Sequence, residues 1–143
     1  MGLMRLARET PEVSPELPVS EAVAIMTSRR VGAVAVTRDH KILGIFTERD
    51  LMRRVVYEAR DPTMTGVWEV MTSPAKTVPD SMPVGDAVAL MRKGHFRHLA
   101  VVDDDDNLLG VVGQRYLLYD LCEELERKVV GLHSYLMVDG PGG

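Results

Sequence analysis

The chain has 143 residues, 45% of them apolar, which is enough for one domain or for two small halves that share a core. Its net charge of −4 gives no electrostatic reason to expect binding to DNA or RNA. Its apolar runs are too short to span a membrane, no secretory signal precedes the first elements, and the lone Cys122 rules out an internal disulfide. We therefore expect a cytoplasmic protein that contacts neither nucleic acid nor membrane.

The first eighteen residues include three prolines and predict mostly irregular chain with a short strand near Val13. A helix is expected next, with Ser20 as its N-cap. Two β-rich runs follow, at 31–36 and 42–46, and the polar turn 39–41 separates them. The shortness of this turn predicts an antiparallel pair of strands.

Thr47 ends the second of these strands and is a good N-cap for a helix that begins at Glu48. Asp50 falls in the first turn, where a carboxylate is favoured by the helix dipole, and we expect it to add only this modest term to stability. A helix N-terminus attracts anions and a carboxylate accepts hydrogen bonds from a diol, so this stretch could hold a phosphate and a ribose. An ordinary capped helix is the alternative. The helix is predicted to bury Leu51, Met52, Val55 and Val56.

The sequence repeats itself after a polar linker. The segment PVSEAVAIM at 18–26 returns as PVGDAVALM at 83–91, which is 65 residues later. The other matching pairs are 34–37 with 99–102, at the same offset, and 43–51 with 109–117, at an offset of 66. Two β-α-β-β-α units, each too small to bury its own faces, predict an α/β (α+β) fold in which the units pack face to face.

A helical apolar stripe continues beyond the second unit, through Leu121, Leu125, Val129, Leu132 and Leu136. It outlasts the corresponding helix of the first unit. Its distal half either packs within the second unit or packs on another subunit, and the sequence leaves both open. The stripe leads us to expect a homodimer, and the Gly-rich end at 139–143 is expected to be disordered.

These features together resemble a tandem pair of CBS domains, also called a Bateman module. The motifs that carry the resemblance are the doubled strand–turn–strand units, GIFTERD at 44–50 and FRHLAVVD at 96–103. The chain is similar to stand-alone bacterial-type CBS proteins, since no fused catalytic or transport domain is evident. The resemblance implies a pseudo-two-fold pair with central strands and outer helices. It implies the following division: repeat 1 at 5–58, a linker at 59–68, repeat 2 at 69–122, and a helical extension with its tail at 123–143.

Adenine nucleotides or related adenosyl ligands commonly bind in the two clefts of such pairs. The resemblance implies that Asp50 takes the ribose hydroxyls and that Thr47 lies near phosphate. The corresponding positions of repeat 2 are degenerate, with Gly113 and Tyr116. One strong site per chain is therefore expected.

Basic groups of repeat 2 are implied at the phosphate. Arg97 and His98 precede its central strand, where repeat 1 has only Gly32 and Ala33. Kinase regulatory subunits that sense AMP carry a basic residue at the position of Arg115. The remaining implied contacts are to the adenine, from Ile45 and Ala100 on its faces and from the backbone of Ala75 and Lys76 at its edge.

The sequence gives little indication of metal binding or catalysis. The acidic run 103–106 lacks the residues that a calcium loop needs and is best interpreted as a solvated turn. No nucleophile–base pair, phosphate loop or zinc motif is found, so an enzyme is not expected. We expect a regulatory module with no required cofactor that binds AMP, ADP or ATP and signals to an unknown partner protein. The alternative is a ligand-free structural or protein-interaction module.

Overall fold

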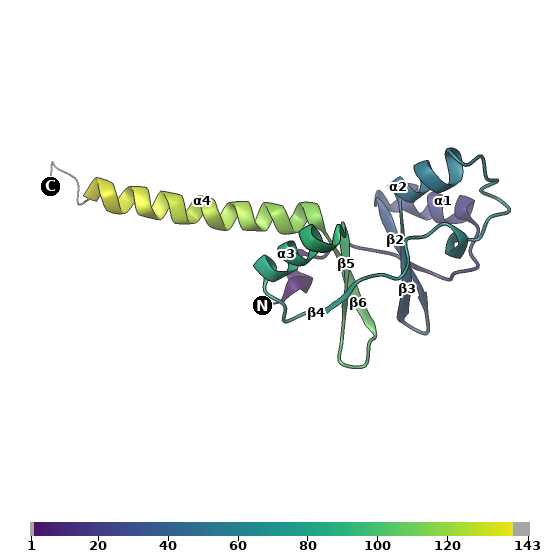
Figure 1. Ribbon diagram of the computed structural model, residues 1–143, viewed down its shortest axis with the longest axis horizontal. Coiled ribbons are helices and arrows are strands. Elements are labelled where there is room, and N and C mark those ends of the chain that lie inside the picture. The colour runs from purple at the N-terminus through teal and green to yellow at the C-terminus, as the bar shows by residue number, and fades with distance from the viewer. Residues whose placement is uncertain (1, 139–143) are drawn as a thin grey trace.

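The computed structural model describes the backbone of residues 2–138 and the side chains of residues 2–132. It has a mixed α/β architecture in which two three-stranded sheets lie in the middle and the helices lie outside them (Figure 1). Among the described residues, no helix combines the length and the hydrophobicity that a membrane crossing requires.

The first half contains one of the two sheets. Strand β1 pairs in parallel with β2, and β2 pairs antiparallel with β3. A short α-helical turn after β3 widens into a π-helical segment, η2. The bounds are η1 Leu3–Leu6, β1 Glu12–Val13, α1 Val19–Arg29, β2 Ala33–Arg38, β3 Lys41–Thr47, α2 Glu48–Asp50 and η2 Leu51–Val56.

The second half repeats this arrangement, which confirms the predicted tandem fold. Its sheet has the order β4-β5-β6, with a parallel pair followed by an antiparallel pair. The difference lies at the end, where one long helix replaces the short α2 and η2. The bounds are η3 Val67–Glu69, β4 Thr77–Pro79, α3 Val84–Gly94, β5 His98–Val102, β6 Leu108–Gly113 and α4 Gln114–Val138.

The segment that leads into each half crosses over to the other half. Thr72 lies ahead of β4, yet it forms an antiparallel bridge with Ile45 of β3, with N···O distances of 3.0 and 2.8 Å. In the same way, Arg8 lies ahead of β1 and bridges to Val111 of β6. The side chain of Leu3 is buried in the core of the second half. The two repeats are therefore interlocked by their lead-in segments.

The sheets meet through a small apolar cluster whose buried members are Ala35, Ile45 and Val111. Each repeat also has its own core of mainly aliphatic side chains on the helix side of its sheet. The two hairpin turns touch as well, since Lys41 Nζ lies 2.9 Å from Asn107 Oδ1. Both walls of the predicted cleft are thus held against one another.

Helix α1 begins differently from the prediction. Its N-cap is Pro18, and Ser20 lies within the helix and makes no cap. The backbone N–H groups of Val19 and Ser20 instead donate to the carbonyls of Thr65 and Pro62, both at 2.9 Å. Because the linker supplies these acceptors, the free N–H groups of the first turn need no side-chain cap. The strand β2 also starts two residues later than predicted, at Ala33.

The prediction that Met52 and Val56 are buried is wrong. They are 57% and 69% exposed, while Val55 is 1% exposed. The π-helical winding of η2 is seen in the bond from Tyr57 N–H to the carbonyl of Met52, at 3.0 Å. A single helical segment presents only one face to the core, and Val55 occupies it.

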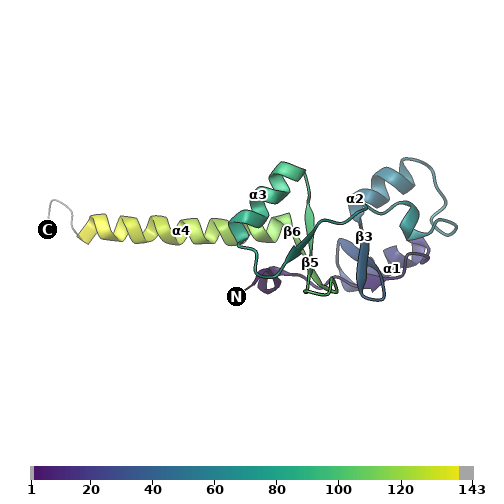
Figure 2. The ribbon, with the colours of Figure 1, turned by 60° about the horizontal axis from the view of Figure 1, so that its bottom comes forward.

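Helix α4 leaves the rest of the molecule after its first turns and projects as an arm (Figures 1 and 2). Leu117 is fully buried, but Leu125, Val129 and Leu132 are 52%, 65% and 61% exposed. The distal stripe therefore does not pack within the second repeat, which decides against the first of the two alternatives. Residues 139–143, for which disorder was predicted, lie outside the described part.

Candidate functional site

Thr47 and Asp50 form a reciprocal cap at the point where β3 passes into α2, as the sequence predicted for Thr47. The N–H of Asp50 donates to Thr47 Oγ1 at 3.2 Å. In return, Asp50 Oδ2 accepts from the N–H of Thr47 at 3.1 Å and from its hydroxyl at 3.2 Å. Asp50 is only 5% exposed, so these bonds operate in a largely desolvated place.

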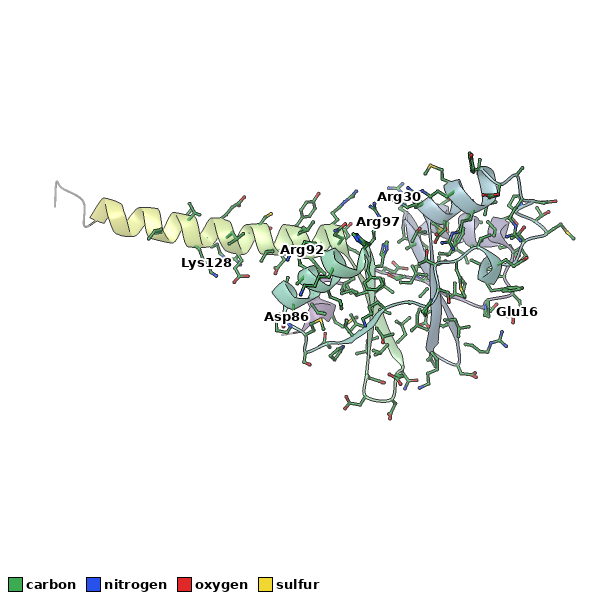
Figure 3. All side chains as sticks on the ribbon, viewed as in Figure 1. Glu16, Arg30, Asp86, Arg92, Arg97 and Lys128 are labelled. Carbon is green, nitrogen blue, oxygen red and sulfur yellow. The ribbon has the colours of Figure 1, made fainter. Side chains whose placement is uncertain are left out.

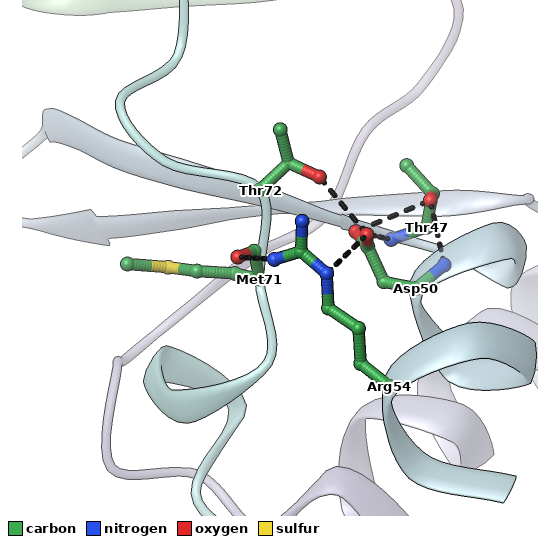
Figure 4. Close-up of polar contacts among 5 residues, drawn as sticks. All are labelled: Thr47, Asp50, Arg54, Met71 and Thr72. Atoms are coloured by element: carbon green, nitrogen blue, oxygen red, sulfur yellow. Dashed lines mark hydrogen bonds and ion pairs between the residues drawn. The ribbon is translucent and has the colours of Figure 1, made fainter. Parts of the chain in front are cut away.

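The other oxygen of Asp50 is tied to the lead-in segment of the second repeat (Figure 4). The Thr72 hydroxyl donates to Asp50 Oδ1 at 2.9 Å. Arg54 Nε lies 3.8 Å from the same oxygen, and Arg54 Nη1 donates to the Met71 carbonyl at 2.7 Å. The expectation that Asp50 adds only a small dipole term is therefore wrong, because its carboxylate joins the first repeat to the chain that enters the second.

The opposite wall carries His98 and Arg97. Burial lowers the pKa of His98, the charge of Asp50 raises it in part, and Arg97 lowers it again. The structure thus brings His98 within electrostatic reach of Asp50, although 48 positions separate them in the chain. Figure 3 places Arg97 at the boundary between the two halves, on the side where the helices lie. The acidic motif and the basic pair therefore lie near one another at the boundary between the two repeats.

Arg49 lies near the predicted site residues Arg97 and Asp50, although the sequence did not lead us to select it. Partial burial lowers its pKa, and the positive charges of Arg97 and Arg53 lower it further, which shows that these guanidinium groups lie near one another. A cluster of like charges in a chain of net charge −4 is a place for an anion. The sequence could have indicated Arg49, because it is the residue of repeat 1 that corresponds, at the offset of 66, to Arg115 of repeat 2, which was predicted to lie near the phosphate.

Arg115 itself is exposed and lies in the first turn of α4. It directly follows Gln114, whose N–H donates to the carbonyl of Arg97 at 2.9 Å. Arg115 and Arg97 are therefore carried by neighbouring backbone segments at the rim. The same bond occurs in the first repeat, from Glu48 N–H to the carbonyl of Gly32 at 3.0 Å.

Of the four positions assigned to the adenine, Ile45 and Ala100 lie deeper, Ala75 is half-buried and Lys76 is exposed. Ile45 and Ala100 are 4% and 0% exposed, so neither side chain has a face open to solvent in this conformation. Ala75 is half-buried and packs against the cluster that contains Ile45. The Lys76 carbonyl accepts from the N–H of Ala100 at 2.8 Å, so that acceptor is already used in the sheet. An aromatic base would enter here only if the repeats moved apart.

The second cleft is closed by the chain itself. The guanidinium of Arg8 lies over the Tyr116 ring, 4.2 Å from its centroid. Where the first cleft has Arg97, this one has Gly32, and a Cβ there would lie 3.2 Å from the Glu48 carboxylate. Of the two adjacent arginines that could supply positive charge here, Arg29 is paired with Glu9 at 2.6 Å, whereas Arg30 is exposed and forms no ion pair among the described residues. An aromatic ring and an acid thus replace the diol acceptor and the cation.

Comparison with known proteins agrees with this architecture. The CBS domain family model matches residues 6–57 and again residues 67–123. The CBS domain-containing protein YhcV of Bacillus subtilis is 33% identical over 107 residues, which cover 75% of each chain. The chain spans less than two thirds of the length of other curated relatives. It covers 62% of the length of an uncharacterized protein of Methanopyrus kandleri and 21% of the length of inosine-5'-monophosphate dehydrogenase of Thermoplasma acidophilum.

Solved structures show the same fold. A putative signal-transduction protein with CBS domains from Burkholderia ambifaria superposes with a TM-score of 0.75 and 29% identity, covering 85% of this chain and 93% of that one. A CBS domain protein from Pyrobaculum aerophilum, whose structure is a complex with AMP, has a TM-score of 0.73 and 24% identity, covering 86% and 99%.

Proposed function

The chain belongs to the CBS domain family as a tandem pair, and on that premise we propose that it is a regulatory module that binds one adenine nucleotide between its repeats and signals this state to a partner protein. One observation carries the proposal. The intact Thr47–Asp50 motif lies within electrostatic reach of His98 and its neighbour Arg97, whereas the equivalent positions on the other side have Tyr116 and Gly32.

In the proposed complex the nucleotide lies with its ribose at Asp50 and its phosphate at the rim. Arg97, Arg49 and Arg115 supply positive charge there, and guanidinium groups bind phosphate oxygens well. The clustered arginines suit AMP, ADP or ATP. AMP is the first ligand to test, because a protein of the same fold was solved with AMP bound.

Ligand binding has a direct route to the second repeat in this arrangement. An ionised carboxylate offers about four acceptor positions. Thr47 occupies two of those on Asp50, Thr72 occupies a third, and Arg54 lies against the same side. A ribose diol donates two hydrogen bonds, so it displaces the Thr72 hydroxyl or Arg54 and removes one tie of the lead-in segment, which the backbone bridge between Thr72 and Ile45 still holds. The nucleotide then favours the arrangement of the repeats in which this segment has moved.

A ligand-free structural or protein-interaction module remains the second candidate, and the same carboxylate favours it. In that case the bonds of Asp50 to Thr47 and Thr72 serve only to lock the repeats together, and the module acts through its surface. The two candidates differ in one measurable property, which is nucleotide binding in this cleft. Neither candidate needs a catalytic group.

A thermal-shift and calorimetry series with AMP, ADP, ATP and S-adenosylmethionine tests the proposal. A ligand at about 100 times its Kd adds about 2.7 kcal/mol to the free energy of unfolding, which raises Tm by several degrees in a domain of this size. We expect Arg97→Ala to remove most of the shift. Arg92→Ala, which changes an exposed arginine at the end of α3, is the matched control and should retain it. No shift with any nucleotide, or equal losses in the two variants, would leave the ligand-free candidate standing.

A further inference from the structure

The distal part of α4 exposes an apolar surface that its own chain does not cover. The helix leaves the globular part as an arm in both views (Figures 1 and 2), and Leu125, Val129 and Leu132 are more than half exposed. In proteins, most of the stability of a helix comes from packing of its apolar face. A covering surface on this face of the 25-residue α4 would therefore stabilise it.

The exposed side chains follow a heptad pattern. Leu118, Cys122, Leu125, Val129 and Leu132 are separated by 4, 3, 4 and 3 residues, and Leu136 continues the series in the sequence. In heptad terms the leucines at 118, 125 and 132 take position d, while Cys122 and Val129 take position a. None of these positions carries a charge. Leucine at d with a β-branched residue at a favours a parallel two-stranded coiled coil; Leu125, Val129 and Leu132 fit this pattern, and Cys122 is a small apolar residue at a.

The stripe is accessible beside the globular part. The side of α4 that faces its own chain carries the buried Leu117 and also Asp120, which pairs with Arg5 at 2.9 Å. Consecutive residues of a helix are about 100° apart, so the stripe that starts at Leu118 lies about a quarter turn away from that side. A second helix can therefore lie along the stripe without displacing the contacts of the first.

We propose that a second copy of this chain covers the stripe, and that the two α4 helices form a parallel coiled coil that joins two modules at the same end. The pattern favours a second copy over another occupant because it is self-complementary. An identical helix in register sets leucine against leucine at each d layer and closes the seam. The proposal is independent of nucleotide binding.

Two adjacent valines provide a matched test. Val129 lies at position a and Val130 at position b, away from the seam, and they are 65% and 63% exposed. We expect the wild type and Val130→Glu to sediment as dimers at tens of micromolar, and Val129→Glu to sediment as a monomer. A monomeric wild type, or a Val129→Glu variant that dimerises like Val130→Glu, overturns the proposal.

The single cysteine reports the orientation of the helices. A parallel coiled coil sets Cys122 opposite Cys122 of the second copy, whereas the antiparallel pairing that aligns the whole stripe sets it opposite Leu132. Cys122 is exposed in the single chain. Mild oxidation of the dimer with copper–phenanthroline should therefore give a disulfide-linked dimer on a non-reducing gel, and Cys122→Ser should give none. A dimer that forms in solution but does not crosslink would refute the parallel arrangement.

Discussion

Replacing Asp50 by Asn tests whether this carboxylate has both a structural and a binding role. The side chain is 5% exposed and accepts hydrogen bonds from the backbone and hydroxyl of Thr47 and from the hydroxyl of Thr72. Asparagine keeps the shape and one acceptor oxygen, but its amide group places donors where Oδ1 or Oδ2 accepted. With its oxygen toward Thr47, asparagine keeps those bonds only as bonds to a neutral acceptor, the Thr72 hydroxyl must accept instead of donate, and the ion pair with Arg54 is lost.

The expected cost follows from these contacts. A hydrogen bond to a charged group contributes about 1.5–3 kcal/mol. The exposed Thr72 can turn its hydroxyl to water, so its share of the loss is small, whereas the cap on Thr47 has no such substitute. We expect Asp50→Asn to lower the free energy of unfolding by about 2–3 kcal/mol. Asp86→Asn is the control: this residue also lies in a helix first turn, but it is exposed, and its change should stay within about 0.5 kcal/mol.

Urea denaturation of the two variants and the wild type gives the stability comparison. Calorimetry with the best-binding nucleotide, well below the unfolding transition, gives the affinity. A ribose contact predicts about 1.5–3 kcal/mol weaker binding for Asp50→Asn, which is about 10- to 100-fold in Kd, and no change for Asp86→Asn. Equal stability of the two variants would refute the structural role, and an unchanged Kd in Asp50→Asn would refute the ribose contact.

Four further outcomes are expected. Arg97→Ala should weaken AMP more than adenosine in calorimetry, since charge-assisted bonds to phosphate are lost only with AMP; equal losses would place Arg97 away from the phosphate. Calorimetry on nucleotide-stripped protein should give one ligand per chain, because Arg8 and Tyr116 close the second cleft, and two sites of similar affinity would contradict this. Thr72→Val should tighten binding by less than about tenfold, since the ligand no longer displaces the Thr72 hydroxyl and that exposed hydroxyl can turn to water, and weaker binding would exclude the displacement route. Burial lowers the pKa of His98, so the unfolded state binds more protons than the folded state as the pH falls through the ordinary histidine range, and the free energy of unfolding decreases. His98→Gln should make the free energy of unfolding depend less on pH in this range. An unchanged pH dependence would show that His98 is not its cause.

The repeat, the strand pairs and the Thr47 cap could be predicted from the amino-acid sequence. The offset of 65 to 66 residues predicted two equivalent halves, and the structure confirms them with the same strand order in each. Thr47 was assigned as an N-cap correctly because a cap depends on residues three positions apart. The short turns predicted the antiparallel strand pairs correctly, because a turn also depends only on neighbouring residues. These features are local, so the spacing of residues along the chain contains the information.

The contacts that join the two halves, and the surroundings of each helix face, follow from the packing of the folded chain and could not be predicted from the sequence. The bond between Asp50 and Thr72 spans 22 positions, and the contact of Arg8 with Tyr116 joins opposite ends of the chain. Periodicity shows that a helix has an apolar face but not what covers it, which is why Met52 was placed in the core and is exposed. Likewise, Ser20 was assigned as a cap because the sequence does not show that carbonyls of the linker already accept those N–H bonds. Contacts between distant segments depend on how the elements pack, and that arrangement exists only in the folded chain.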